Sequence, residues 1–375
     1  MIRIDTYRED NRHRLNAVCP YFTMFPLAFP KKILSKANSN AVVLDPFCGR
    51  GTSNYAARDR GLTSYGIDSS PVAVAIAKAK MVNTTFDDVM HLTWSILINK
   101  RATSIPSGEF WKRAYHEDTL NELVRLRHGL LECDQSDAAV MLRAIVLGCL
   151  HGPLPKNLEN AGYFSNQMPR TYATKPAYSI KYWKLNHLNA PRIPVVVPIQ
   201  KKAAAIFASI MKKSPTPPSS IICADSRTTT AFKHIDNRVS HVITSPPYYG
   251  LRTYVADQWL RNWFLGGETK VRYKNNNQIS HASPQEFAAS LSDVWNNCGD
   301  VLKRNGRLII RFGSIKSRHI DPREVINESI SISRHSWHLY RTVPLDPARP
   351  EKRQAHHMGT GGKALKEYDF YIKSN

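Results

Sequence analysis

Four short apolar runs, each ending in a small polar or acidic residue, constrain the fold of this chain more than any other feature. A strand buried in a parallel sheet is covered on both faces, so its sequence is a nearly continuous apolar run. The runs lie at 41–45 (AVVLD), 63–68 (TSYGID), 220–225 (SIICAD) and 241–245 (HVITS). Helical stretches follow the first two runs, at 53–60 and 71–80. This alternation predicts an α/β fold with a Rossmann-like, doubly wound, mostly parallel sheet.

The C-terminal part of the sequence adds further elements to the predicted sheet. Helical spacing extends over 284–303, and an Asn-Gly pair then precedes a fifth strand candidate at 307–312. Two more strands are predicted at 337–345 and 364–373, joined by a polar loop.

A long insertion interrupts the alternation between the second and third strand candidates, at 83–218, and it is too long for a simple crossover. Its first half is predicted to be helical at 86–98, 119–131 and 138–150. Its second half, 151–203, is irregular and mixes basic with aromatic residues, which suits either a nucleic-acid surface or a solvated proline-rich loop. We therefore predict one domain made of 1–82 and 219–375, and an inserted target-recognition region at 83–218.

Charge and cysteine content limit the partners and the compartment of this chain. It has 52 Lys and Arg against 30 Asp and Glu, a formal net charge of +22, and 42% of its residues are hydrophobic. A disordered basic tail lacks that apolar content, so a folded protein with a polyanionic partner is expected. The six cysteines include no Cys-x-x-Cys pair, and the first residues contain no apolar leader. We expect a cytoplasmic protein with reduced thiols, without a metal site and without a membrane span.

The segment DPFCGRGT, at 45–52, follows the first predicted strand and opens a helix. Gly49 and Gly51 allow the backbone to approach a ligand closely at the helix N-terminus. Asp68 ends the second strand, where a carboxylate accepts hydrogen bonds from ribose, and Asp225 ends the third, where it can contact an adenine amine. The third glycine of the dinucleotide fingerprint is missing, so an adenosyl ligand without phosphates is favoured. The alternative interpretation is that Asp45, Asp68 and Asp225 only cap helices.

A second motif, TSPPYYG at 244–250, follows the fourth strand at the edge where ligands bind in open α/β sheets. Pro246 and Pro247 stiffen the loop and lack amide donors, so the Ser245 hydroxyl and the loop carbonyls can accept the hydrogens of an exocyclic amine. An amine held in this way has its lone pair free to attack a sulfonium methyl, while Tyr248 stacks on the extruded base. Otherwise the motif is a rigid turn with core tyrosines.

With these motifs the sequence resembles the amino-methyltransferases of DNA, which methylate cytosine N4 or adenine N6 with S-adenosylmethionine. VLDPFCGRGT is similar to the family's cofactor motif, YFTMFPLAFPKKIL to the segment covering the methionine end of the cofactor, and TSPPY to the catalytic motif. The resemblance covers residues 20–82 and 219–373, and it implies that the last two predicted strands form an antiparallel hairpin. The insert has no counterpart in it.

The resemblance implies S-adenosylmethionine as cofactor and a partner restriction endonuclease, from which such an enzyme protects host DNA. Serine at the start of the catalytic motif is more typical of cytosine-N4 enzymes than of adenine-N6 enzymes. The catalytic residues are expected to be Ser245, Pro246, Pro247 and Tyr248. The expected cofactor-binding residues are Thr23, Phe25, Asp45, Pro46, Phe47, Gly49, Gly51, Thr52, Asp68, Ser69, Asp225 and Ser226.

The motif order is that of the family branch with its target-recognition region between the two motifs, so the insert is expected to bind double-stranded DNA. Amides read adenine and arginine reads guanine in the major groove, whereas lysines contact phosphates. The expected DNA contacts are Asn166, Gln167, Arg170, Lys175, Lys181 and Lys184. The basic loop RPEKRQAHH at 349–357 is a second candidate, and its two histidines have no third metal ligand at suitable spacing.

Several alternatives stay open at the level of sequence. Adenine N6 is one, because the first residue of the catalytic motif does not decide between the two bases. RNA guanine-N2 methyltransferases share the Pro-Pro-aromatic motif, so an RNA substrate is another. A catalytically silent nucleic-acid-binding protein with the same fold is the third. A carbon-5 cytosine methyltransferase is disfavoured, because its cysteine nucleophile usually follows a proline and no Pro-Cys pair is present.

Overall fold

The computed structural model describes residues 11–21, 25–133, 135–168, 175–208, 217–235, 239–250, 255–271, 279, 281–314, 320–345 and 366–374. The chain forms two compact units. The sheet unit comprises Tyr21–Met81, Pro215–Arg252 and Asn276–Asn375. The helical unit comprises Met1–Pro20, Val82–Ser214 and Thr253–Asn275.

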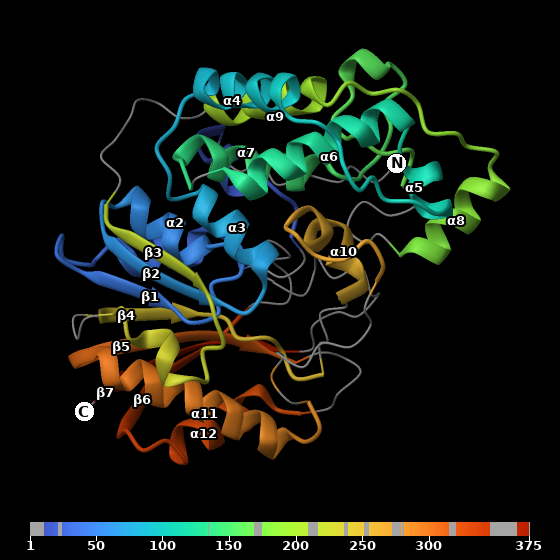
Figure 1. Cartoon of the computed structure of the whole chain (residues 1–375). Coiled ribbons are helices and arrows are strands. Elements are labelled where there is room, and N and C mark those ends of the chain that lie inside the picture. Colours follow the sequence, from blue (N-terminus) through green and yellow to red (C-terminus); the bar gives the residue numbers. More distant parts are fainter. Residues whose placement is uncertain are drawn as a thin grey trace, which may run out of the picture. The chain divides into compact units, whose positions relative to one another are not determined.

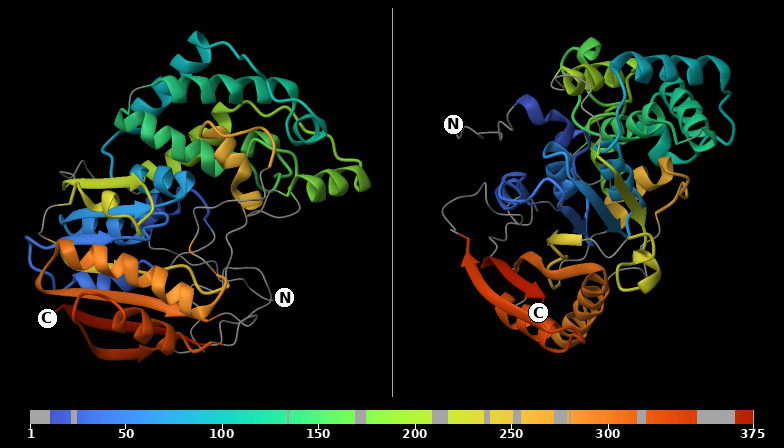
Figure 2. Two further views of the ribbon diagram at one scale, coloured as in Figure 1. Left: turned by 60° about the horizontal axis from the view of Figure 1, so that its bottom comes forward. Right: turned by 90° about the vertical axis from the view of Figure 1, so that its left-hand side faces the viewer.

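The sheet unit is built on one seven-stranded sheet with the order β3-β2-β1-β4-β5-β7-β6. The strands are β1 (Val42–Asp45), β2 (Thr63–Asp68), β3 (Ser219–Cys223), β4 (Val239–Thr244), β5 (Leu302–Gly313), β6 (Trp337–Pro344) and β7 (Glu367–Ser374). Strands β1 to β5 pair in parallel, whereas β7 runs antiparallel to both β5 and β6. The predicted Rossmann-like sheet is therefore confirmed, with β6 and β7 at its outer edge (Figures 1 and 2).

Helices cover both faces of this sheet. They are α1 (Ala28–Leu34), α2 (Thr52–Asp59), α3 (Pro71–Ala79), η3 (Thr229–Phe232), α11 (Pro284–Val301) and α12 (Pro322–Ser331). Figure 1 shows α2 and α3 on one face and α11 and α12 on the other. Helices α3, α11 and α12 each begin with proline after a side-chain cap, from Ser70, Ser283 and Asp321. Because proline suits the first helical position and the cap satisfies an unpaired N–H, these helix starts are encoded locally.

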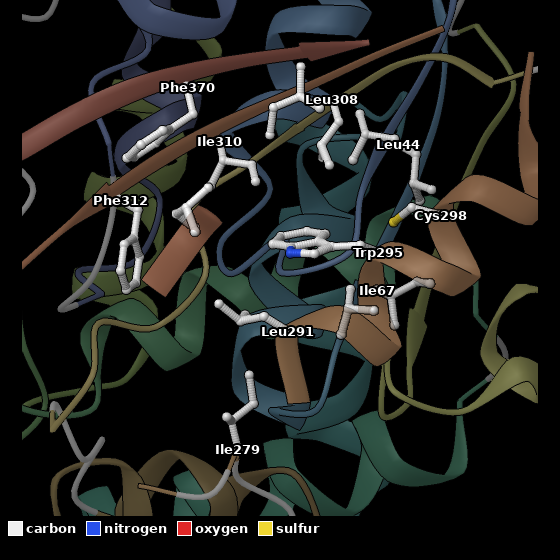
Figure 3. Close-up of a cluster of buried hydrophobic side chains, with 14 of the residues drawn as sticks. Leu44, Ile67, Ile279, Leu291, Trp295, Cys298, Leu308, Ile310, Phe312 and Phe370 are labelled. Carbon is white, nitrogen blue, oxygen red and sulfur yellow. The ribbon is translucent and has the colours of Figure 1, made fainter. Parts of the chain in front are cut away.

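The hydrophobic core of the sheet unit lies between the strands and α11 (Figure 3). Trp295 of α11 is completely buried in it, among residues that include Leu44 of β1 and Leu308 of β5. Its indole N–H donates to Ser329 Oγ of α12 at 3.0 Å. Because a buried N–H without a partner is costly, this bond ties α12 to α11 under the central strands and helps to hold the sheet rigid.

The described part of the helical unit contains helices and no strand. They are η1 (Asn11–Ala17), α4 (Phe86–Asn99), α5 (Glu109–Ala114), α6 (Glu117–Glu132), α7 (Asp137–Cys149), η2 (Leu158–Asn160), α8 (Pro176–Leu185), α9 (Val196–Phe207) and α10 (Val255–Phe264). The three helices predicted in the first half of the insert are confirmed as α4, α6 and α7. The expectation that 151–203 is irregular is wrong, because α8 and α9 lie there and their prolines occupy first turns, where a helix tolerates them.

Two segments, Met1–Pro20 and Thr253–Asn275, correct the predicted domain boundaries, since both belong to the helical unit. The second contains α10, whose Arg261 is 2% exposed and donates to the Leu147 carbonyl of α7 at 3.1 Å. Arg127 of α6 donates to the Trp263 carbonyl of α10 at 2.7 Å. These bonds integrate α10 into the helical unit, which is therefore built from three chain segments instead of one. None of the described helices is both long and apolar enough to cross a membrane.

Candidate active site

The carboxyl ends of β1 and β4 are neighbours, and the strand order reverses between them. In open α/β sheets, ligands bind in the crevice outside such a switch point. Asp45 ends β1 and Thr244 ends β4. The Thr244 hydroxyl donates a hydrogen bond to Asp45 Oδ1 at 2.6 Å. This bond joins the cofactor motif to the catalytic motif across 199 residues of sequence.

The cofactor loop, DPFCGRGT at 45–52, has at Gly51 a backbone conformation that only glycine adopts without strain. Its φ is +73°, and a Cβ at this position would lie 2.8 Å from Ala77 Cβ of α3. The Gly51 N–H donates to the Cys48 carbonyl at 2.7 Å, which closes the turn before Thr52 begins α2. Gly49 also has a positive φ, of +50°. This geometry supports the predicted close approach of a ligand to the backbone at the start of α2.

Asp68, at the end of β2, holds the cofactor loop in place. Its two carboxylate oxygens accept hydrogen bonds from the Gly49 N–H at 2.9 Å and from the Ser70 N–H at 2.8 Å. Burial raises the pKa of the Asp68 carboxyl, and the two bonds, which favour the charged form, offset that shift in part. Each oxygen has more than one lone pair, so Asp68 can also accept from ribose hydroxyls. The neighbouring Ser69, also predicted to bind the cofactor, is exposed.

Asp45 is completely buried and carries an unpaired oxygen. Its Oδ1 accepts from the Phe47 N–H at 3.1 Å as well as from Thr244, whereas Oδ2 has no hydrogen-bond partner among the described residues. Burial raises the pKa of Asp45 to about 7. A buried acceptor without a donor is unfavourable, so this oxygen fits a ligand that brings hydrogen-bond donors, as S-adenosylmethionine does.

Replacing Asp45 by asparagine should remove a pH dependence from the stability. The Asp45 pKa is about 7 in the folded protein against 3.8 for a free side chain, so the folded state binds more protons between these values. In wild type, the contribution of protonated Asp45 to the free energy of unfolding is complete below about pH 4. It is lost as the pH rises to about 7, which lowers the free energy of unfolding by up to ~4 kcal/mol. Relative to wild type, Asp45→Asn should therefore become more stable from pH 4 to pH 8 in urea unfolding. A constant difference over that range would contradict the raised pKa.

Asp225 and Ser226, both predicted to bind the cofactor, have other partners in the structure. The Asp225 carboxylate is held by the Arg227 guanidinium, with 2.6 Å between Oδ2 and Nη2, and this contact lowers the pKa of Asp225. An adenine amine would have to share that carboxylate with Arg227. Ser226 is 5% exposed and donates its hydroxyl to the Pro46 carbonyl, while Asn297 donates to the Ser226 carbonyl at 2.9 Å. Ser226 therefore supports the backbone of the cofactor motif through Pro46, and its contact with the cofactor stays a prediction.

The catalytic loop, 245–250, is anchored by the elements around it. Ser245 is 7% exposed at its start. The Tyr249 ring packs against Phe287 of α11, with 5.5 Å between ring centroids. At its end, the Gly250 N–H donates to His281 Nδ1 at 3.1 Å. These contacts support the stiff loop that its two prolines predict.

Tyr248 lies in the core, and its stacking on an extruded base stays a prediction. Its side chain is 1% exposed, and its hydroxyl donates to the Glu367 carboxylate of β7. The ring centroid lies 5.4 Å from that of Phe312, and a Cβ at Gly313 would lie 3.0 Å from Tyr248 Cε2. Burial and the nearby Glu367 raise the pKa of the Tyr248 hydroxyl, so it keeps its proton and donates. Stacking on a base requires one ring face to be uncovered first.

The segment preceding the cofactor motif is described from Phe25 onward, and Thr23 lies outside the described residues. Phe25 is 5% exposed and packs edge-on against Phe29 of α1, with ring centroids 5.4 Å apart. The Arg311 guanidinium of β5 lies 4.0 Å from the Phe29 ring centroid. Phe25 is therefore fixed to the sheet unit near the strands that carry the site, a position compatible with its predicted role.

Two of the predicted DNA contacts are structural, which corrects the expectation that they read bases. Asn166 is 1% exposed, and its amide donates to the carbonyls of Arg113 and Leu188 at 3.0 and 3.4 Å. The Gln167 side-chain oxygen accepts from the Leu154 N–H at 2.7 Å. Both amides satisfy backbone groups of the helical unit, so neither presents its donor and acceptor to a base. The prediction of base reading rested on residue type alone, and residue type carries no information on burial.

The lysines in and beside α8 are exposed, and their contacts with phosphates stay a prediction. Lys175, which precedes the helix, and Lys181 are exposed, and Tyr178 between them is 51% exposed. Lys184 forms an ion pair with Glu109 of α5 at 2.7 Å, so its charge is partly neutralised. Arg170 and the basic loop at 349–357 lie outside the described residues. Within the described residues, no group of three or more His, Cys, Asp or Glu side chains could hold a metal ion.

A comparison with known protein families agrees with the cofactor motif. The N6/N4 DNA methylase family model matches residues 3–79, which confirms the resemblance to DNA amino-methyltransferases for that part of the chain. No curated protein sequence matches the chain.

Among solved structures, the rRNA methyltransferase aviRa from Streptomyces viridochromogenes is 12% identical, with a TM-score of 0.36, and 98% of this chain and 93% of that one are covered. Geranyl diphosphate C-methyltransferase from Streptomyces coelicolor A3(2) is 9% identical, with a TM-score of 0.35, and the covered shares are 93% and 74%. At these TM-scores the fold assignment rests on the strand order.

Proposed function

From the DNA methylase sequence carried by residues 3–79, we propose that this methyltransferase acts on an exocyclic amine of a flipped DNA base, namely cytosine N4, with S-adenosylmethionine as donor. One observation carries the proposal: the hydrogen bond from Thr244 to Asp45 at the switch point of the sheet. It holds a loop suited to an adenosyl ligand beside a loop suited to an amine. Neither motif by itself requires the other motif to lie beside it.

The cofactor side of the site is formed by the cofactor loop and two carboxylates. When bound, S-adenosylmethionine supplies a methyl group attached to a positively charged sulfur. The leaving group is that sulfur, as a neutral thioether. The Gly49 and Gly51 backbone contacts the ligand, and Asp68 accepts from its ribose. The unpaired Asp45 Oδ2 accepts a further donor. These assignments use side chains that the structure already holds in place, so little ordering is needed on binding.

On the substrate side, the Ser245 hydroxyl and the Pro246 carbonyl accept the two hydrogens of the amine. Pro246 and Pro247 have no N–H, so no loop donor at these positions competes for the nitrogen lone pair. As the new N–C bond forms, the carbon–sulfur bond breaks and the nitrogen becomes positively charged. The loop oxygens stabilise that charge, and one amine proton then leaves to solvent, which gives the neutral methylated amine.

Identification of the methylated nucleoside tests this function directly. The protein is incubated with DNA and labelled S-adenosylmethionine, and the product is digested and analysed by mass spectrometry. N4-methyl-2′-deoxycytidine from wild type, absent with Ser245→Ala, is the expected result. N6-methyl-2′-deoxyadenosine would overturn the cytosine assignment, and methylation of RNA but not of DNA would favour the guanine-N2 alternative. Tight DNA binding without S-adenosylmethionine affinity in calorimetry would favour the silent protein.

DNA affinity should decrease steeply with salt, because lysine contacts release counterions from the phosphates. Exposed Lys181 of α8 is expected to make one such contact. Lys181→Gln should reduce the slope of log affinity against log salt concentration by about 0.9 in fluorescence anisotropy titrations. Lys100→Gln is the matched control, because the Lys100 ammonium is already paired with Glu132 at 2.6 Å. Equal slopes for wild type and Lys181→Gln would contradict the proposed contact between Lys181 of α8 and a DNA phosphate.

A restriction setting and a cytoplasmic location stay predictions that follow from the resemblance and the composition. A partner endonuclease would cut the same sequence that this protein methylates. DNA treated with the protein and S-adenosylmethionine should then resist a nuclease of that specificity, whereas DNA treated with Ser245→Ala should be cut. Cleavage of both samples would exclude protection by this modification.

A further inference from the structure

The Tyr248 side chain is fixed at both of its ends. Its backbone follows Pro246 and Pro247, whose φ angles are restricted. Its hydroxyl donates to Glu367 Oε1, at the first residue of β7. A tyrosine side chain has two rotatable bonds, so fixing the backbone and the hydroxyl leaves the ring with one orientation. The sequence motif contains only the first of these anchors.

Glu367 is itself held firmly by its neighbours in the sheet. It pairs with Gly313 of β5 in the β5–β7 register. The Leu345 N–H donates to the Glu367 carbonyl at 2.9 Å, and the Ser314 N–H donates to the Lys366 carbonyl at 3.0 Å. Its carboxylate is therefore presented from backbone that is bonded on both sides. Gly313 also leaves room for the ring, since a Cβ there would lie 3.0 Å from Tyr248 Cε2.

The charges around Glu367 favour its role as an acceptor. Glu367 is 4% exposed, and a carboxylate buried to that extent needs hydrogen bonds or an opposite charge. Arg311 lies in the same cluster and forms a two-pronged ion pair with Asp369, at 2.7 and 2.9 Å. One guanidinium thus faces two buried carboxylates, Asp369 and Glu367. The Tyr248 hydroxyl donates a further hydrogen bond to Glu367.

We propose that Glu367 is a positioning residue for methyl transfer: it holds the Tyr248 hydroxyl and thereby sets the plane of the ring on which the target base stacks once one face of this buried ring is uncovered. The proposal rests on the function proposed above, because only a base substrate requires that plane. A misplacement of about 1 Å can lower a rate about 100-fold, so a ring fixed in advance favours the reactive geometry. Glu367 does not touch the reacting atoms and acts through Tyr248.

A double-mutant cycle tests this role. Tyr248→Phe removes only the hydroxyl, and Glu367→Gln keeps an acceptor oxygen but removes the charge. Each is expected to lower kcat at saturating DNA and cofactor, about tenfold for Tyr248→Phe and less for Glu367→Gln. In the Tyr248→Phe background, Glu367→Gln should have no further effect on kcat. The KM for S-adenosylmethionine should stay unchanged, and rates are normalised to the folded fraction from urea unfolding.

Asp369→Asn is the matched control, because it removes a buried carboxylate two residues along the same strand that pairs with Arg311 and not with Tyr248. Any effect it has on kcat should multiply with that of Tyr248→Phe. The proposal is overturned if the Glu367→Gln and Tyr248→Phe effects also multiply, or if Glu367→Gln lowers stability and leaves kcat unchanged. Wild-type protein that methylates no nucleic acid would overturn the proposed function and this role with it.

Discussion

In the Tyr248→Ala variant, methyl transfer should fall by about 100-fold or more, while affinity for S-adenosylmethionine is retained. The substitution removes the proposed stacking surface and leaves the cofactor loop intact. It also empties a core position, since Tyr248 is 1% exposed, and such a truncation costs about 3–5 kcal/mol of unfolding free energy. Single-turnover rates are therefore normalised to the folded fraction from circular dichroism, and cofactor affinity is measured by calorimetry.

Tyr249→Ala separates loss of stacking from loss of packing. Tyr249 is the next residue, is 5% exposed and packs against Phe287, so its truncation empties a comparable position. It has no proposed contact with the base. We expect a similar loss of stability but a decrease in rate of at most about tenfold. Equal rates for the two variants would show that packing alone explains the Tyr248→Ala effect.

Gly51→Ala should weaken S-adenosylmethionine binding by about 100-fold. An alanine at φ +73° costs about 1–2 kcal/mol, and its Cβ would lie 2.8 Å from Ala77 Cβ, an overlap that costs about 1–3 kcal/mol. The loop must shift to relieve the overlap, and it then leaves the position from which it contacts the cofactor. Calorimetry with S-adenosylmethionine measures the change in affinity, and urea unfolding measures the change in stability.

Gly61→Ala provides the control for backbone strain. Gly61 has a similar φ, of +68°, but an added Cβ would meet no atom within 4 Å. It should therefore lose the same 1–2 kcal/mol for the left-handed conformation and keep the cofactor affinity of wild type. If Gly61→Ala also loses affinity, general destabilisation accounts for the effect. If Gly51→Ala binds normally, the cofactor loop is assigned wrongly.

The strands of the sheet unit were predictable because each is a local feature. Apolar runs such as AVVLD need no long-range information to be identified as buried strands, and Pro71 marks the start of α3 in the sequence itself. Helices α8 and α9 were missed because their prolines and lysines resemble a solvated loop. Thr253–Asn275 was assigned to the wrong unit, since the bonds of Arg127 and Arg261 that integrate α10 join residues more than a hundred positions apart.

The candidate site was predictable in its motifs and not in its supporting contacts. The cofactor and catalytic motifs are contiguous, so their glycines, prolines and serine could be read together. Asn297 and Glu367 belong to neither motif, and no signal in the sequence marks them as parts of the site. Thr244 lies in the catalytic motif, but the sequence does not show that it bonds to Asp45. The opposite error occurred at Asn166, where a side chain suited to reading adenine is instead buried and bonded to backbone carbonyls.

The sequence by itself determined the fold class, the two motifs and their placement at strand ends, because these depend on backbone conformation and on burial patterns of neighbouring residues. Only the tertiary structure decided that Thr244 binds Asp45 and that Glu367 holds the Tyr248 hydroxyl. The physical reason is that a hydrogen bond depends on distance and direction between two groups. Residues 119 and 199 positions apart acquire that geometry only when parallel and antiparallel strands bring them to one edge of the sheet.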